Sequence, residues 1–550
     1  MPTSPDGLDS LTDTEIRTSL GSGDLDRIEA LFDALWYDLA SRFAPELLRA
    51  VEGIPSSAFD ARPRLLHAVL LGYHRMSYAE GEHQQLRRAL QFYVVTGQRY
   101  SKRLPSLTRP GDLVTAGAAA VISGRMRGDY KGAEHLGAWT DAQVRLGTVR
   151  PALPWLSVRA AARPGWLSAE RGLTAMLAGS LDRATQLFTR AHDEAGDPPY
   201  AHYAGTAAAA NLALLAAYRG HLDLARTWLA TLESSGPLPD WIQHLTTVGA
   251  EIARALIAID EGDPTTAARL LSRIGAVTQK VELWPFVAYA NAGYEAHYGD
   301  PHKGLRMLDT ARQQHGALRP DPTTMTGELV LRAEAKLLLR VGAGTRVLSL
   351  ADRHAEVEAL MLHATWAHLL AGEHHEAMRM SAEALQHHDL PVNDQMGHHL
   401  ALAIASLRTG HPERGATSFL AAIRLRSTPA HVSPFLALRD DELDELSALA
   451  LVPNPLLLHS GAIPARRNTP PSGMLVHLTP RESAVLRALS AGATAEQTAA
   501  QSGVSVTTVR SQIRKIYQKL RVSNRNEALA RAQHLGLLRV PRLTSHDRAG

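Results

Sequence analysis

The sequence contains no cysteine among its 550 residues. Disulfide bonds, thiolate nucleophiles and cysteine-ligated zinc sites are therefore excluded. The chain also has no apolar run long enough to span a bilayer, and its first residues lack the basic and then apolar pattern of a secretory signal. We therefore expect a cytoplasmic protein with no membrane segment.

Sequence motifs that carry catalysis are missing as well. No lysine follows a glycine, so the chain lacks the glycine-rich loop that cradles nucleotide phosphates, and it has no GxSxG nucleophile elbow. Histidine doublets occur at 374–375, 387–388 and 398–399, but adjacent side chains on a helix point roughly 100° apart and no HExxH pattern accompanies them. We expect no enzymatic activity, no cofactor and no metal site; a histidine-based pH or metal sensor and a hydrolase within the helical body stay open as alternatives.

Positive charge is concentrated in one part of the chain. Residues 475–550 contain twelve Arg and Lys against four Asp and Glu, a net charge of +8. The whole chain carries only +3, so residues 1–474 sum to −5. Clustered positive charge on a small helical segment is typical of nucleic-acid binding. The alternative is an ordinary helical bundle whose arginines form a solvated face.

Residues 478–538 predict four short helices with a helix-turn-helix in the middle. Each helix begins at a residue that can cap free backbone N–H groups, and these caps are Thr479, Thr494, Ser505 and Asn524. Glycines end or separate the helices, at positions 492, 503 and 536. The agreement of caps, turn glycine and local charge favours a DNA-binding unit over the ordinary bundle.

The third of these helices, residues 506–520, is the longest and has two distinct faces. Apolar residues recur at spacings of four, three and four and predict a buried stripe; they are Val509, Ile513, Ile516 and Leu520. Polar and basic residues lie off that stripe: Thr507, Thr508, Arg510, Ser511, Arg514 and Lys515. A helix in the major groove places its N-terminal half against base edges, so we expect this second face to contact DNA.

An ordered set of motifs makes the segment similar to the LuxR/FixJ/GerE-type DNA-binding domain. The motifs are LTPRE at 478–482, a small-residue turn, TVR at 508–510, KIYQKL at 515–520 and NRNEA at 524–528. The segment departs from the family pattern at Gln512, where histidine is common, and at Arg521, where glycine is common. It departs also at Ala495, Glu496 and Thr498, which replace a commoner Asn-Lys-Glu-Ile run. A residue with a side chain at 521 raises the energy of the fold if the backbone there needs a positive φ.

The resemblance also implies roles for individual residues. It assigns base contacts to Arg510, Ser511 and Arg514. It assigns phosphate contacts or positioning on DNA to Thr507, Thr508, Lys515 and Lys519. On the last helix it implies a dimer surface, for which the candidates are Ala528, Leu529 and Ala532. The sequence alone does not divide these last residues between the domain core and a partner.

A repeat occupies the middle of the chain. A glycine followed five positions later by a small residue permits a tight turn and then a close approach of two helices. The pairs are Gly128/Ala133, Gly179/Ala184, Gly220/Ala225, Gly262/Ala267, Gly299/Gly304, Gly372/Ala377 and Gly410/Gly415, with Gly342/Val347 as a degenerate copy. Four copies add an alanine seven residues further on: Ala191, Ala311, Ala384 and Ala422. Such units stack into a solenoid, and these resemble degenerate tetratricopeptide hairpins.

We therefore predict an all-α protein, a tetratricopeptide-like α-solenoid followed by a small four-helix helix-turn-helix domain. The predicted domains are an N-terminal helical cap of the array (1–115), helical repeats that bind an effector or partner (116–451), a proline-rich linker (452–474), the DNA-binding domain (475–540) and a tail (541–550). Helices are expected over 14–30, 31–49 and 63–79 in the cap, and over 440–451 at the end of the array.

These features predict a sequence-specific transcriptional regulator, an activator, whose helical body controls the DNA-binding domain. The chain resembles the helical arm and DNA-binding tail of large LuxR-type regulators without their ATPase module. Expected partners are double-stranded DNA, a second copy of the chain on DNA, RNA polymerase, and an unidentified effector ligand or protein on the array. The alternative is a protein-interaction scaffold in which DNA binding serves only as an address.

Overall fold

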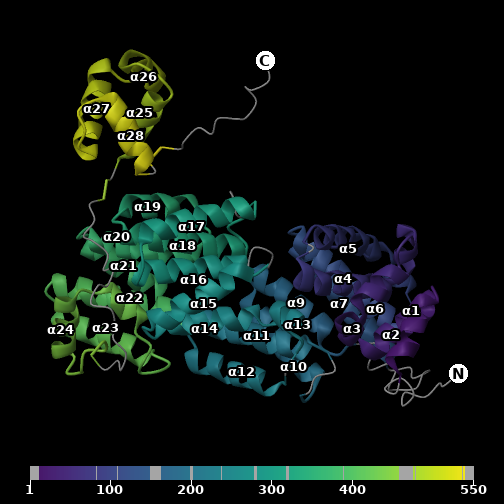
Figure 1. Cartoon of the computed structure of the whole chain (residues 1–550). Helices are drawn as coiled ribbons and strands as arrows, with labels where there is room; N and C mark the ends of the chain where they lie inside the picture. The colour runs from purple at the N-terminus through teal and green to yellow at the C-terminus, as the bar shows by residue number, and fades with distance from the viewer. Residues whose placement is uncertain are drawn as a thin grey trace. The chain divides into compact units, whose positions relative to one another are not determined.

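The computed structural model describes residues 11–538, apart from residues 82, 108, 149–162, 199–201, 237, 278–281, 317–320, 388, 458–474, 477 and 536. Every regular element in this part of the chain is a helix, which confirms the all-α prediction (Figure 1). No described helix is both long enough and apolar enough to cross a membrane. The chain forms two compact units, residues 1–254 and 255–550, and the division falls within the predicted array.

The first hundred residues contain more helices than the sequence predicted. They are α1 (Asp13–Gly21), α2 (Leu25–Leu35), α3 (Tyr37–Ala50), α4 (Pro63–Glu80) and α5 (His83–Arg103), with short 3-10 helices η2 (Ser56–Ala61) and η3 (Leu104–Ser106). The helix expected over 63–79 is confirmed as α4, but those expected over 14–30 and 31–49 are wrong. The first breaks where the Asp24 side chain accepts hydrogen bonds from two backbone N–H groups and starts α2. The second breaks at Trp36, whose φ is 50°.

The predicted repeat forms eight helical hairpins in the described residues. They are α6 (Pro110–Met126) with α7 (Tyr130–Thr148), α9 (Trp166–Leu177) with α10 (Leu181–Ala195), α11 (Ala204–Tyr218) with α12 (Leu222–Ser234), α14 (Val248–Asp260) with α15 (Pro264–Val277), α16 (Trp284–His297) with α17 (Pro301–Gln314), α18 (Met325–Arg340) with α19 (Gly344–Arg353), α20 (Met361–Leu370) with α21 (His374–Ala384), and α22 (Val392–Arg408) with α23 (Pro412–Arg424). Short elements α13 (Asp240–Thr246) and η5 (Glu358–Leu360) lie between hairpins. Every hairpin turn contains one of the predicted glycines, including that of the degenerate copy.

Seven of the eight turn glycines have φ between 72° and 88°, a region that side chains disfavour. Gly299 is the exception, and it is needed for space instead. A Cβ atom there would lie 2.0 Å from Oε2 of Glu295. That carboxylate accepts hydrogen bonds from the Asp300 backbone N–H at 2.8 Å and from Lys303 Nζ at 2.6 Å. The same sequence signal therefore has two different physical origins.

The small residue five positions after each turn lies where the two helices meet. Six of these positions are alanine or valine with at most 1% of the side chain exposed: Ala133, Ala184, Ala225, Ala267, Val347 and Ala377. At Gly304 a Cβ atom would lie 2.6 Å from Leu337 Cδ2 of the next hairpin, so even alanine is too large. The pattern thus reports close packing of helices, as expected.

The hairpins of residues 284–424 pack as two layers. The first helices of successive hairpins (α16, α18, α20 and α22) contact one another in that order, and each second helix packs beside them (Figure 1). Helix α18 is buried on most sides, whereas α17 buries only Gly304 and Leu308. A helix buried on most sides belongs to the inner layer, and a helix with a single narrow apolar stripe belongs at the surface.

Residues 432–433, near the end of the array, contact Asp260 in an earlier hairpin. The Asp260 backbone oxygen accepts from Val432 N–H at 2.8 Å, and its carboxylate accepts from the Ser433 hydroxyl and from Asn393 Nδ2. Asp260 ends α14, and Ser433 begins the 3-10 helix η6 (Ser433–Ala437). This contact, the Asp260 junction, joins residues 173 positions apart. Repeats that touch only their neighbours would not predict it.

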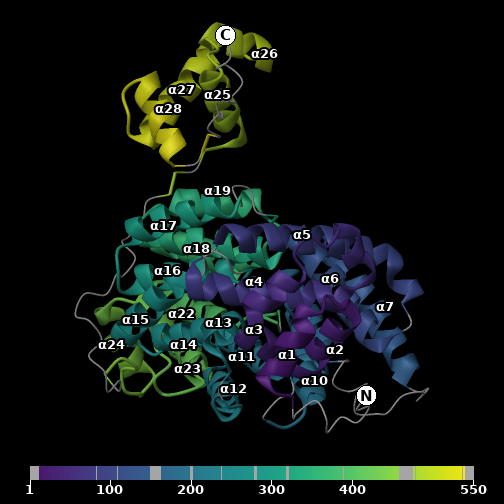
Figure 2. The ribbon, with the colours of Figure 1, turned by 45° about the vertical axis from the view of Figure 1, so that its right-hand side comes forward.

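The predicted last helix of the array is confirmed as α24 (Asp440–Leu449), two residues shorter than expected. Most of the predicted linker, residues 458–474, lies outside the described residues, and so does the predicted tail, 541–550. The DNA-binding segment follows as α25 (Pro480–Ser490), α26 (Ala495–Ser502), α27 (Val506–Leu520) and α28 (Arg525–His534). These four helices form one small bundle (Figure 2).

Candidate nucleic-acid interface

The four helices of the bundle begin at the predicted caps. Thr479 Oγ1 accepts from Glu482 N–H at 3.2 Å, and the Glu482 carboxylate accepts from Thr479 N–H at 2.8 Å. Thr494 and Gln497 form the same reciprocal pair at the start of α26. Ser505 and Asn524 cap α27 and α28 through single side-chain hydrogen bonds. These contacts are local in sequence, and they fix where each helix starts.

The bundle has its own apolar core. Its fully buried members come from α25, α26, α27, α28 and the turn after α28: Val485, Leu486, Leu489, Ala499, Val509, Ile516, Leu520, Ala528, Ala532, Leu535 and Leu538. Of the predicted stripe on α27, only Ile513 is partly exposed. Between α26 and α27, Gly503 adopts a φ of 65° and ends the first helix of the helix-turn-helix. The core therefore holds α27 with its opposite face outward.

That outward face carries the residues predicted to contact DNA. Exposed side chains are found at all seven positions: Thr507, Thr508, Arg510, Ser511, Arg514, Lys515 and Lys519. Arg514 and Lys515 have no ion pair among the described residues, so their charges are available to an external anion. An exposed basic helix on a rigid core is what the major groove of DNA accepts.

Arg510 is held by a contact that the sequence did not reveal. Its Nη2 atom lies 2.8 Å from Oε1 of Glu496 on α26, and both side chains are more than half exposed. The pair orients the guanidinium but contributes little to the stability of the fold, because both side chains are exposed to solvent. Glu496 is one of the positions that departs from the family pattern. The acidic residue here pairs with the arginine that was predicted to contact bases.

Lys519 makes a different kind of contact. Its Nζ atom lies 2.6 Å from Oε2 of Glu482, whose side chain is only 5% exposed. The ammonium group and the Thr479 cap both lower the pKa of Glu482 against the opposing effect of burial. Lys519 therefore ties the C-terminal half of α27 to the first turn of α25. The phosphate contact expected from the resemblance stays a prediction, and Lys519 would have to leave Glu482, or share its charge, to make it.

The end of α27 has the strained backbone that the sequence raised as a question. Arg521 adopts φ 56° and ψ 52°, the left-handed conformation in which glycine is usual. Its N–H still closes the helix by donating to Gln518 O at 3.2 Å. The departure from the family's glycine is thus tolerated without loss of the helix end, at an energetic cost of about 1–2 kcal/mol.

Helix α28 separates the predicted dimer residues into two groups. Ala528 and Ala532 are 0% exposed and lie inside the core, so they close the bundle and offer no surface to a partner. Leu529 is half-buried against the same core. The exposed positions of the helix are Asn526, Glu527, Ala530, Arg531 and Gln533. A partner surface on α28 would therefore be drawn from these residues with the edge of Leu529.

Two of the histidine doublets lie on different helices of the array, with 374–375 on α21 and 398–399 on α22. Burial lowers the pKa of His398 to about 4, and burial also lowers the pKa of His399 and His374. His388 lies outside the described residues. In the described residues, no group of three or more histidine, aspartate or glutamate side chains is arranged to hold a metal ion.

Comparison with known proteins identifies the bundle. A search among curated proteins returned no match to the chain. Residues 476–532 match the family described as bacterial regulatory proteins, luxR family. The match begins before α25 and ends within α28, so it covers the caps, the helix-turn-helix and the basic face of α27. Residues 476–532 are thus a LuxR-family helix-turn-helix domain, and they support a role for this protein in transcription regulation.

Proposed function

We propose that this protein is a sequence-specific transcriptional activator whose helical body binds an effector or a protein partner and thereby controls the DNA-binding domain. The observation that carries the proposal is the exposed face of α27, with Arg510, Ser511 and Arg514 projecting from a capped and packed helix. In this proposal these three residues contact base edges, and Thr507, Thr508 and Lys515 contact phosphates. An activator would also contact RNA polymerase.

DNA binding by the domain alone is the first test. The core of the bundle is internal to residues 476–538, which supports independent folding, although so few helices give a small core. A fragment of residues 475–550 should bind duplex DNA, and its affinity should fall steeply as salt increases. The measurement is fluorescence anisotropy over a salt series, with helix content checked by circular dichroism. A folded fragment without salt-dependent binding would refute the proposal.

A dimer on DNA follows from the size of the reading face. One recognition helix contacts too few base pairs to select a genomic site. We propose that two copies read related half-sites, with Asn526, Leu529, Ala530 and Gln533 as the contact between them. Footprinting should show a repeat with centres about 10 base pairs apart. One copy bound to one half-site, with no effect of deleting the neighbouring half-site, would contradict the dimer.

A role for the body as regulator is tested on the full chain. Binding of an effector to the body should change the affinity of the full chain for DNA, because coupling requires that the effector bind two states differently. The scaffold alternative predicts instead a stable protein complex on the body with no change in DNA affinity. Gel shifts with and without the bound molecule separate the two.

A further inference from the structure

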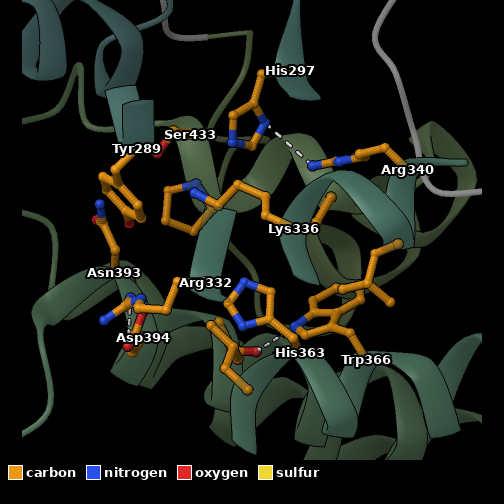
Figure 3. Close-up of a pocket in the computed structure, with 15 residues that line it drawn as sticks. Tyr289, His297, Arg332, Lys336, Arg340, His363, Trp366, Asn393, Asp394 and Ser433 are labelled. Carbon is orange, nitrogen blue, oxygen red and sulfur yellow. Dashed lines mark hydrogen bonds and ion pairs between the residues drawn. The ribbon is translucent and has the colours of Figure 1, made fainter. Parts of the chain in front are cut away.

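A half-open pocket lies within residues 289–437, between the first helices of the last hairpins. It is lined by residues of α16, α18, α20 and α22 and by η6, and it encloses about 100 Å³ (Figure 3). The Asp260 junction holds two of its wall residues, Asn393 and Ser433, in place. This volume is smaller than the roughly 150 Å³ of an engineered apolar cavity that accommodates benzene. Because the pocket is half open, part of a small ligand can lie inside it while the remainder lies in the opening.

Three cations from one helix line the pocket. Arg332, Lys336 and Arg340 are four residues apart on α18, and this spacing places them on one face of the helix. Figure 3 shows Lys336 between Arg332 on one side and Arg340 on the other. Asp394 is the one carboxylate among the described lining residues, and its Oδ1 and Oδ2 atoms lie 2.6 and 2.8 Å from Arg332 Nη2. The lining thus has a surplus of two positive charges.

The histidines of the pocket do not add to this charge. Burial, together with Arg340 and Lys336, lowers the pKa of His297 well below its ordinary value. Burial, together with Arg332 and Lys336, does the same to His363. His297 Nδ1 lies 3.2 Å from Arg340 Nη2, and a guanidinium can only donate, so the imidazole proton is on Nε2. Both rings are neutral, and His297 can donate a hydrogen bond from Nε2.

The remaining wall is aromatic and apolar. Lys336 Nζ lies 5.1 Å from the centre of the Tyr289 ring, and Trp366 lies on the opposite side of the pocket in Figure 3. Trp366 Nε1 donates to Gly397 O at 3.3 Å, which fixes the indole. Leu339 and Leu362 complete this wall. Ligand sites commonly combine such apolar surfaces with a few charged groups that fix the orientation of the ligand.

We propose that this pocket binds a small organic anion, with its carboxylate or phosphate against Lys336 and Arg340 and its planar apolar part between Tyr289 and Trp366. The proposal rests on the proposed function only in naming the pocket as the effector site; binding itself is independent of DNA. Burial lowers the pKa of Arg340 to about 10, because it removes the guanidinium from water. An anion placed against Lys336 and Arg340 would accept charge-assisted hydrogen bonds from both side chains.

The test uses the full chain and isothermal calorimetry in a buffer free of phosphate, sulfate and carboxylates. The probes are phenyl phosphate, benzoate, inorganic phosphate, benzyl alcohol and benzylamine. We expect phenyl phosphate or benzoate to bind, and the neutral and cationic probes not to bind. Comparing the first two probes distinguishes a phosphate ligand from a carboxylate ligand. Inorganic phosphate binding as strongly as phenyl phosphate would overturn the organic part of the assignment.

Variants then locate the binding. Lys336→Gln should weaken the anion about ten- to a hundredfold, as expected for a lost charged hydrogen bond. Lys336→Arg keeps the charge and should retain most of the binding, so it controls for misfolding. Lys102→Gln removes an exposed lysine of α5 and should have no effect. Equal loss in Lys336→Gln and Lys336→Arg, or no binding of either organic anion to the unmodified chain, would overturn the proposal.

The result is separable from the DNA-binding proposal. Anion binding in a chain whose 475–550 fragment does not bind DNA would leave the pocket assignment intact and refute the regulator. The opposite result would leave the regulator intact and remove this pocket as its effector site.

Discussion

Arginine has opposite roles in the helical body and in the DNA-binding domain. In the body, Arg332 is 2% exposed and its guanidinium contacts the buried Asp394. Arg171 is also 2% exposed and contacts two carboxylates, Glu134 and Asp141. In the domain, Arg514 is exposed with no carboxylate beside it among the described residues, and Arg510 is 68% exposed. These two arginines of the body join helices, and these two arginines of the domain are exposed to solvent.

The comparison shows that a count of basic residues does not locate a binding surface. A buried guanidinium with a carboxylate partner is already satisfied, and removing it leaves the partner's charge in a poorly solvated place. An exposed guanidinium without a partner contributes little to stability and remains available to a phosphate or a base. Exposure and pairing, rather than residue type, separate the two roles.

Arg332→Ala should give the largest effect. Its removal leaves Asp394, whose side chain is 5% exposed, as an uncompensated buried charge, and the free energy of unfolding should fall by about 3–5 kcal/mol. The matched control is Arg379→Ala on α21, which removes an exposed arginine paired with Glu376 and Glu383 and should lower the free energy of unfolding far less. Urea denaturation of both variants measures the two losses of stability. Similar losses would refute the distinction between buried and exposed arginines.

The loss in Arg332→Ala should also depend on pH. Burial raises the pKa of Asp394 above its ordinary value of 3.8 even with Arg332 present. A raised pKa means that the folded protein binds this proton at higher pH than the unfolded chain does, so ionisation of Asp394 opposes folding. The stability loss should be complete well above the raised pKa and should shrink as pH falls through it. A loss that stays constant from neutral pH to pH about 4 would contradict this cause.

Arg510→Ala tests the other side of the comparison. It should leave the stability of the domain nearly unchanged and should reduce discrimination at one or two base pairs by about 1–3 kcal/mol. The measurement is anisotropy on a selected site, on its single-base variants and on random duplex. Equal loss on all duplexes would move Arg510 to the phosphate-contacting class.

Lys515 and Lys519 allow the comparison to be made within one helix, because both lie on α27. Lys515→Ala should weaken all duplexes and lower the slope of log affinity against log salt by about 0.9, without destabilising the domain. Lys519→Ala should lower domain stability by about 1 kcal/mol, because Glu482 loses its partner. Adding Glu482→Gln to Lys519→Ala should recover part of that loss. No recovery would show that the pair does not stabilise the domain.

Glu496→Gln should give the smallest effect on stability, because both side chains of its pair with Arg510 are exposed. The variant frees Arg510 and removes a negative charge near the DNA, so affinity should rise about twofold at low salt. Thermal unfolding and anisotropy measure the two quantities. A fall in affinity would show that Glu496 positions Arg510 for binding.

Features that depend on neighbouring residues were predictable from the sequence. The caps Thr479 and Thr494, the turn glycines and the small residue after each turn are local signals, and the structure has each where it was expected. The buried stripe of α27 follows from helical periodicity in the same way. The exposed face of α27 was predictable because it consists of the residues that lie off that stripe.

Features that depend on distant residues were not predictable. Lys519 and Glu482 are 37 positions apart, and no local pattern relates them. The pocket combines residues from five elements, and its three cations are indistinguishable in sequence from a solvated helix face. The break at Trp36 was missed because apolar residues continue through it, while the backbone leaves the helical conformation at this single residue. The burial of Ala528 and Ala532 in the core was not predictable, because small residues fit both a core and an interface.

The Asp260 junction has a consequence for how this part of the protein unfolds. A row of hairpins that touch only their neighbours frays from its free ends, and each repeat can open separately. Here the last turn of α14 is bonded to Val432, Ser433 and Asn393. The hairpins between Asp260 and Ser433 therefore form a closed loop. Opening one of them requires the contacts of the Asp260 junction to break as well. Residues 260–433 should exchange their amide hydrogens as one cooperative unit, and Asp260→Ala, which removes the two side-chain bonds and keeps the backbone bond to Val432, should weaken that cooperativity.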